Sequence, residues 1–217
     1  MLENIKGVIF DLDGTLIDSM WIWEKIDLEF IKLKSLNISS QQIMNDLAPL
    51  TFDESALYFI NNFNLKESTK EITDIWMTMA IKEYENNVFL KKGAYDFLIY
   101  LKNKNVKIAL ATSSDERLLC KALEKNNIKS FFNYIVTTDM VGLSKDNPDF
   151  YLLLADNLNI NPDNLAVFED IPQAMAAAKK AGMKVFAIYD SYSKHLKNDI
   201  LLNSDFYLND FSEVKIK

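Results

Sequence analysis

The pattern of hydrophobic and polar positions divides the chain into three stretches. Residues 7–10 form a short apolar run that ends at acidic residues, which is typical of a buried parallel strand. Residues 19–87 change to helical spacing, and no convincing strand interrupts them. From residue 91 onward, short apolar runs alternate with helical segments. The chain therefore begins and ends in one pattern and carries another between.

The third stretch predicts an alternation of helices and strands. Gly182 is a typical helix stop within it. Such an order implies a parallel sheet with right-handed crossovers and helices on both faces. The predicted fold class is α/β, with a Rossmann-like parallel sheet core. Helices are expected at 94–104, 115–126, 149–158 and 172–181, and strands at 106–111, 134–136, 165–168 and 185–188.

The helical stretch lies inside the alternating pattern, so the predicted core is discontinuous. We assign residues 1–17 and 91–217 to the core and residues 18–90 to an inserted all-α domain of four helices. Ligands of open parallel sheets bind beyond the carboxyl ends of the strands. An insertion that leaves directly after the first strand is therefore expected to act as a lid over that edge. Its helical runs lie near 21–33, 43–47, 56–63 and 72–84.

Composition and charge narrow the function classes. The 217 residues are 49% hydrophobic and 25% charged, which is ordinary for a folded domain. The net charge of -7, without a basic stripe, argues against a nucleic-acid partner. No apolar run approaches the roughly 20 residues of a membrane span, and the N-terminus does not resemble a signal peptide. Cys120, the single cysteine, is expected to be a small core residue. We expect a cytoplasmic monomer or small homo-oligomer that acts on a small molecule.

Two acids follow the first predicted strand. Asp11 and Asp13 are followed by Gly14, which lets the backbone leave the sheet sharply, and by Thr15. One carboxylate can attack phosphorus while its neighbour protonates the leaving oxygen and later deprotonates water. The same Asp-Leu-Asp-Gly sequence can also be a simple acidic turn. The choice between these interpretations therefore depends on the residues found after the other strands.

Phosphate-binding groups are expected at two later points. The strand near residue 110 runs into Thr112 and Ser113, where hydroxyl and backbone N–H groups can hold phosphoryl oxygens; a strand-end or capping role is the alternative. Lys145 stands before the turn-forming Pro148 and can neutralise phosphoryl charge, although most lysines are solvated surface charges. Thr112, Ser113, Lys145 and Gly14 are thus the predicted phosphate-binding residues.

A pair of acids also ends the buried run at residues 165–168. Glu169 and Asp170 either cap the helix that begins near residue 172 or bind a cation. Hard cations prefer carboxylate and carbonyl oxygens, so Mg²⁺ is the predicted cofactor. The predicted metal set is Asp11, Asp13 through its backbone carbonyl, Asp170 and Glu169.

Taken together, the four segments resemble the four motifs of the haloacid dehalogenase superfamily, in order. The insertion resembles the small helical cap of its phosphoglycolate phosphatase-like and β-phosphoglucomutase-like members. The resemblance implies a magnesium-dependent phosphomonoesterase in which Asp11 is the nucleophile and Asp13 the general acid/base. Thr112 corresponds to the phosphate-binding hydroxyl, Lys145 to the motif-three lysine, and Asp170 with Glu169 to the metal acids.

The sequence departs from that pattern at three positions. Asp146 stands where many relatives have proline after the lysine, and Ile171 and Ala174 replace the usual Ser or Thr and the later Gly. The loop around the metal is therefore expected to differ in detail. Because the carboxylates are retained, metal binding is still expected.

Other members of the superfamily provide the alternatives. A sugar-phosphate mutase resembles its relatives in carrying a cap histidine and a cap arginine, but here these positions hold Trp23 and Thr51-Phe52. The only histidine, His195, is expected at the surface. A dehalogenase lacks the second acid, and a phosphonatase needs an imine-forming cap lysine, for which Lys32, Lys34 and Lys82 are the candidates. A non-catalytic phosphate-binding module would not need Asp13.

The insertion also supplies candidate substrate contacts. Trp21, Trp23, Phe52 and Met77 are the bulky apolar residues considered, and Trp23 and Phe52, together with Thr15 of the core, are the predicted pocket residues. Aromatic residues at helical spacing more often pack the core of their own domain, and that interpretation stays open.

Overall fold

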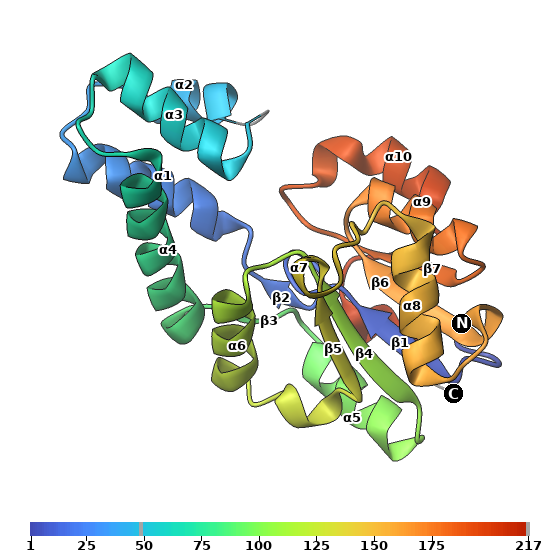
Figure 1. The fold of residues 1–217 in the computed structure, drawn as a ribbon. Coiled ribbons are helices and arrows are strands. Elements are labelled where there is room, and N and C mark those ends of the chain that lie inside the picture. The colour runs from blue at the N-terminus through green and yellow to red at the C-terminus, as the bar shows by residue number, and fades with distance from the viewer. Residues whose placement is uncertain (48–49, 216–217) are drawn as a thin grey trace. The chain divides into compact units, whose positions relative to one another are not determined.

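A six-stranded parallel sheet forms the centre of the larger part of the protein (Figure 1). This computed structural model describes residues 1–47 and 50–215. The strand order β5-β4-β1-β6-β7-β8 places the first strand between two that come much later in the chain, so the carboxyl ends of β1, β4 and β6 meet where the strand order reverses. The predicted α/β class is confirmed. The strands are β1 (Gly7–Phe10), β4 (Lys107–Thr112), β5 (Tyr134–Thr137), β6 (Leu165–Glu169), β7 (Lys184–Ile188) and β8 (Phe206–Leu208).

The two faces of the sheet carry different side chains because successive residues of a strand point to opposite sides. Phe10 and Phe168 stack on one face with ring centroids 5.2 Å apart, and Phe97 of helix α5 (Ala94–Asn103) packs edge-on against Phe10. The other face carries smaller residues such as Ile9 and Val167. These form one buried cluster with the apolar sides of helices α8 (Pro148–Leu158), α9 (Pro172–Lys180) and α10 (Lys197–Asn203).

Side-chain caps fix the start of two of the helices that pack on this sheet. Asp115 accepts a hydrogen bond from Arg117 N at the start of α6, and Asn147 accepts one from Asp149 N at the start of α8. The α-helices are α5 (Ala94–Asn103), α6 (Glu116–Lys125), α7 (Thr138–Val141), α8 (Pro148–Leu158), α9 (Pro172–Lys180) and α10 (Lys197–Asn203). Short 3-10 turns are η1 (Lys129–Phe131), η2 (Pro162–Asn164), η3 (Lys194–Leu196) and η4 (Phe211–Glu213).

The chain divides into two compact units, Met1–Ser19 with Val88–Lys217 and Met20–Asn87. Both crossings between them run through a short antiparallel ribbon, in which Ile17 pairs with Leu90 and Asp18 with Phe89. This ribbon, β2 (Ile17–Asp18) and β3 (Phe89–Leu90), belongs to the first unit. The limits predicted for the insertion, 18 and 90, fall within these two strands.

Among the described residues of the second unit, every regular element is a helix. Two of its helices begin with a capping box, in which Thr51 pairs with Glu54 and Ser68 with Glu71. Its aromatic core includes Phe30, Phe59 and Trp76, whose rings pack edge-on. The helices are α1 (Trp21–Leu33), α2 (Ser40–Leu47), α3 (Phe52–Phe63) and α4 (Thr69–Asn86). Over the part of the chain described, none of the helices is long and apolar enough to cross a membrane.

Several short elements were not predicted. The ribbon strands β2 and β3 have two residues each and β8 has three, which is too short for an alternating pattern to be recognised. The four-residue helix α7 follows its strand without a break, and Thr137 caps it by accepting from Met140 N. The three strands depend on pairing with distant segments rather than on local pattern.

The buried hydroxyl of Tyr151 leads to a prediction about stability. This side chain is 1% exposed, and within the described residues its hydroxyl has no hydrogen-bond partner. Burying a hydroxyl without a bond costs free energy, so Tyr151→Phe is expected to leave the free energy of unfolding unchanged or to raise it by up to about 1 kcal/mol in urea titration. As the matched control, Tyr58→Phe removes a hydroxyl that donates to Asp46 at 2.6 Å and is expected to destabilise. A loss above about 1 kcal/mol for Tyr151→Phe contradicts the argument.

Candidate active site

Asp11 follows β1 directly and lies beside a buried ammonium group. Lys145 Nζ donates to Asp11 Oδ1 at 2.6 Å and to Glu169 Oε1 at 2.5 Å. Asp11 is 7% exposed and Glu169 is 1% exposed, so this three-residue network is almost completely removed from solvent. Lys145 reaches it from the loop before Pro148, whose position at the start of α8 fixes the end of that loop.

A third buried carboxylate joins the group from the residue that directly follows β6. Asp170 is 2% exposed, and its Oδ1 accepts a hydrogen bond from Thr15 Oγ1 at 3.0 Å. Glu169 Oε2 accepts from Asp170 N at 2.7 Å. One oxygen from each of Asp11, Glu169 and Asp170 lies within 4.8 Å of the others. Two of these acids come from one strand end and the third from its neighbour, which explains the convergence.

Burial and the neighbouring charges both shift the pKa values of the groups in this cluster. Burial, with the charge of Glu169, raises the pKa of Asp11 to about 7, although Lys145 acts in the opposite direction. Burial and the charges of Glu169 and Asp11 also hold the pKa of Asp170 well above its usual range. Burial lowers the pKa of Lys145, but the charges of Asp11 and Glu169 outweigh it and keep the pKa well above the ordinary value. Three carboxyl groups thus share one lysine, and a further cation would favour their ionised forms.

Asp13 is held separately from that cluster by two hydroxyl groups. Ser19 Oγ donates to Asp13 Oδ1 at 2.6 Å, and Ser114 Oγ donates to Asp13 Oδ2. Asp13 is only partly buried, unlike Asp11. The two carboxylates of the Asp-Leu-Asp sequence thus have different surroundings, as two different chemical roles would require.

The loop between these acids and β2 is tightly closed by its own backbone. Gly14 has a φ of 76°, a left-handed conformation that glycine adopts without strain. Its N–H donates to Ile17 O at 3.1 Å, and the N–H groups of Leu16 and Ile17 both donate to Leu12 O. Thr15 therefore lies on a well-ordered turn, fully buried, with its hydroxyl on Asp170 rather than facing a cavity.

The other predicted phosphate-binding residues stand at the end of β4. Thr112 is 1% exposed, and its Oγ1 accepts from Ser114 N at 3.0 Å. Ser113, between them, is exposed. Thr112 thus orders the turn that carries Ser114 to Asp13.

The predicted pocket residues of the insertion lie in the second unit. Trp23 and Phe52 contact each other edge-on with ring centroids 5.7 Å apart, and Phe52 also packs on Trp76 at 5.2 Å. Thr51, at the position where a mutase would have its arginine, is the cap of α3. His195, as predicted, is exposed, in η3 of the first unit.

Two functional candidates, Ser19 and Ser114, were missed by the sequence reasoning. Ser114 ends the hydroxyl run at residues 112–114, so the run itself was a usable signal. Ser19 precedes a helix and resembles an ordinary cap, but Met20 is the N-cap of α1 and no side chain bonds there. Only the fold shows that the Ser19 hydroxyl is used by Asp13.

Comparisons with known proteins agree with this geometry. A family model described as haloacid dehalogenase-like hydrolase matches residues 8–188. A phosphorylated carbohydrates phosphatase from Thermotoga maritima is 27% identical over 188 residues, 83% of each chain. β-Phosphoglucomutase from Bacillus subtilis is 30% identical over 190 residues, 82% of this chain and 81% of that one. The crystal structure of CbbY from Rhodobacter sphaeroides in complex with phosphate has a TM-score of 0.78 at 20% identity and covers 97% of this chain and 96% of that chain, a likeness of fold.

Proposed function

Because this chain belongs to the haloacid dehalogenase-like hydrolase family, we propose that it is a divalent-metal-dependent phosphomonoesterase that forms an aspartyl phosphate on Asp11. The family resemblance noted in the sequence is confirmed, and the relatives named as phosphatases support the assignment to phosphoric monoester hydrolases. The observation that carries the proposal is the buried Asp11 carboxylate, ion-paired with Lys145 at the centre of a sheet edge where two further acids converge.

The donor set fits a hard divalent cation. Asp11, Glu169 and Asp170 offer only carboxylate oxygens, which suits Mg²⁺. Both Glu169 oxygens already accept protein hydrogen bonds, so we assign direct ligation to Asp11 and Asp170, with the backbone carbonyl of Asp13, and a supporting position to Glu169. When bound, the cation would offset the negative charge of the substrate phosphate and of the cluster.

The proposed reaction has two steps, in which Asp11 and Asp13 act in turn. Asp11 attacks phosphorus in line, the bond between phosphorus and the leaving oxygen breaks, and Asp13 gives that oxygen its proton. Water then attacks the aspartyl phosphate while Asp13 takes a proton from it, which releases phosphate and restores Asp11. Lys145 neutralises phosphoryl charge. The Ser19 and Ser114 hydroxyls hold the Asp13 carboxylate in one orientation between the two steps.

Substrate recognition follows from the same assignment. We propose phosphate contacts for Thr112, Ser113 and Gly14 at the strand ends, and a small phosphorylated metabolite as the substrate. Thr15 is better assigned to orienting Asp170 than to the pocket, because its hydroxyl already donates to that carboxylate. Trp23 and Phe52 stay predictions as contacts for the leaving group.

The test is phosphate release from p-nitrophenyl phosphate by the purified wild-type protein. Activity is expected with Mg²⁺. It is expected to fall at least about 100-fold in excess EDTA, because the buried acids then have the Lys145 ammonium group but no metal ion. Restoring Mg²⁺ should restore the rate, whereas adding Ca²⁺ serves as the control for a larger, less demanding cation. A folded protein that releases no phosphate with Mg²⁺, from this compound or from a panel of phosphorylated metabolites, contradicts the proposal.

A second candidate function, a sugar-phosphate mutase, is favoured by the 30% identity to β-phosphoglucomutase. Against it, Trp23 occupies the position where the mutases have a histidine. Thr51 is the N-cap residue of α3 and stands where they have an arginine. Sugar-phosphate isomerisation that requires a bisphosphate activator, without net phosphate release, would favour the mutase.

A further inference from the structure

Lys91 is the point at which the chain, returning from the second unit, is attached to the turn that carries the catalytic acids. Its backbone N–H donates to Leu16 O at 2.9 Å. The N–H of Leu16 donates to Leu12 O, and the hydroxyl of its neighbour Thr15 donates to the Asp170 carboxylate. A single backbone bond thus joins Lys91 to the turn between Asp11 and β2.

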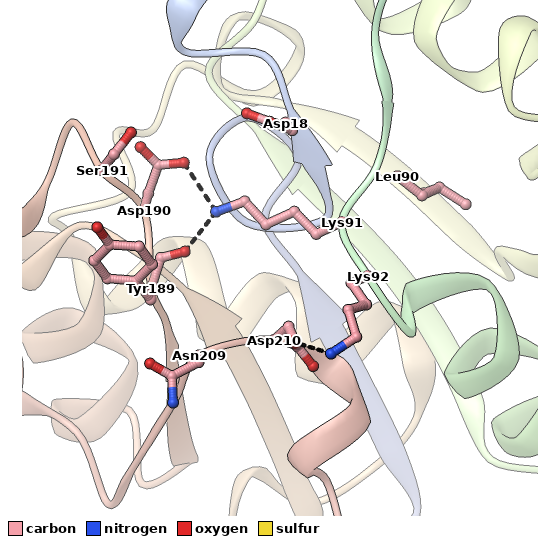
Figure 2. Close-up of a pocket in the computed structure, with 9 residues that line it drawn as sticks. All are labelled: Asp18, Leu90, Lys91, Lys92, Tyr189, Asp190, Ser191, Asn209 and Asp210. Atoms are coloured by element: carbon pink, nitrogen blue, oxygen red, sulfur yellow. Dashed lines mark hydrogen bonds and ion pairs between the residues drawn. The ribbon is translucent and has the colours of Figure 1, made fainter.

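The Lys91 side chain makes a second attachment to a different segment. Figure 2 shows the ammonium group directed at the loop after β7, where it donates to Tyr189 O at 2.7 Å and to Asp190 Oδ2 at 2.9 Å. The second Asp190 oxygen accepts from Tyr192 N at 2.8 Å. The side chains of Lys91 and Asp190 are 10% and 4% exposed. The pair is therefore buried and bonded on both partners, even though it borders a cavity of about 340 Å³.

The next residue provides a natural contrast. Lys92 pairs with Asp210 at 3.1 Å, but its side chain is 77% exposed (Figure 2). Exposed pairs of this kind contribute little to stability. A buried pair is different, because its desolvation cost often equals its attraction and its advantage over apolar residues then lies in fixing one geometry. Substituting each of these adjacent lysines therefore separates the effect of losing a buried ion pair from the effect of losing a positive charge at the surface.

The segment that holds Lys91 is next to the metal acids. Strand β7 pairs with β6 in a register that aligns Ala187 with Glu169. Asp190 follows β7 by two residues, so the ion pair connects the turn of Asp11 and Thr15 with the strand beside Glu169 and Asp170. We propose that Lys91 and Asp190 are positioning residues for the active site: their buried ion pair holds the turn between Asp11 and β2 against the end of β7, the strand beside the one that carries the metal acids. The inference rests on the proposed function for its kinetic consequence.

The experiment compares Lys91→Met/Asp190→Asn with Lys92→Met. The double variant removes the ion pair without leaving a buried unpaired charge, and Lys92→Met removes the adjacent exposed charge. With p-nitrophenyl phosphate and Mg²⁺, the double variant is expected to lose at least about tenfold in kcat, because a small displacement of reacting groups is costly. Hydrogen exchange of the Gly14 and Ile17 amides is expected to accelerate at least about tenfold. Lys92→Met should match the wild type in both measurements.

Exchange and kinetics together decide the inference. Wild-type exchange rates at Gly14 and Ile17 in the double variant overturn it, as does an unchanged kcat when the wild type is active. If the wild type releases no phosphate, the proposed function fails, and exchange alone then decides whether the pair orders the turn. Should the double variant not fold, Asp190→Asn, which keeps the lysine, is measured against the same two criteria.

Discussion

Asp11→Asn is expected to reduce phosphate release by about 10³-fold or more while the protein stays folded. An amide cannot displace the leaving group as a carboxylate does, and loss of a nucleophile removes most of the catalytic acceleration. The fold should tolerate the change because burial already favours the neutral form of Asp11, whose pKa is raised to about 7. The amide oxygen can still accept from Lys145. The measurement is kcat with p-nitrophenyl phosphate in saturating Mg²⁺, alongside thermal unfolding.

The control for this prediction is Asp96→Asn, which removes an exposed carboxylate from the first turn of α5. It should leave kcat within about twofold, since surface substitutions away from special features have small effects. Should Asp11→Asn keep more than about a tenth of the wild-type rate, Asp11 is not the nucleophile. Mass spectrometry of wild-type protein quenched during turnover is the direct complement, because the aspartyl phosphate adds its mass to the peptide that contains Asp11.

The fold could be predicted because its signals are local. Buried parallel strands are continuous apolar runs, as residues 165–168 of β6 are, and helices such as Ala94–Asn103 have a repeating apolar side. The order of these elements then restricts the sheet topology. What local signals could not provide was the β2–β3 ribbon, since its two-residue strands exist only because they pair with each other.

The candidate site could be predicted in part for a related reason. Residues at the ends of parallel strands converge whatever their separation in sequence, so Asp11 and Asp170 could be grouped by position alone. Lys145 lies in the loop between α7 and α8, and its place in the site was predicted from Pro148 and from the family resemblance. Hydrogen bonds within the site could not be predicted, because they depend on side-chain geometry. Ser114 lies 101 residues from Asp13, and Thr15 lies 155 residues from Asp170. Thr15 was therefore assigned to the pocket, and the serines that hold Asp13 were missed.

The second large prediction concerns Lys145, whose ammonium group lies inside the acidic cluster. Lys145→Met is expected to lower kcat by about 100-fold or more, because the group that neutralises phosphoryl charge is lost. The metal-free variant is also expected to lose about 3 kcal/mol of unfolding free energy, since Asp11 and Glu169 are left facing each other without a positive charge. Urea unfolding in EDTA measures this loss, and saturating Mg²⁺ should recover part of it by supplying the missing positive charge.

The matched control is Lys179→Met, which breaks a partly exposed pair with Asp205 at 3.0 Å. Its effect on unfolding should stay within about 1 kcal/mol and should not depend on Mg²⁺. The comparison separates a lysine that balances a buried acidic cluster from one that forms an ordinary surface pair. If Lys145→Met unfolds like Lys179→Met and responds no more to Mg²⁺, then the lysine does not balance the buried carboxylates. The acids would in that case be stable in their protonated forms, and the argument that the cluster requires a further cation would fail with it.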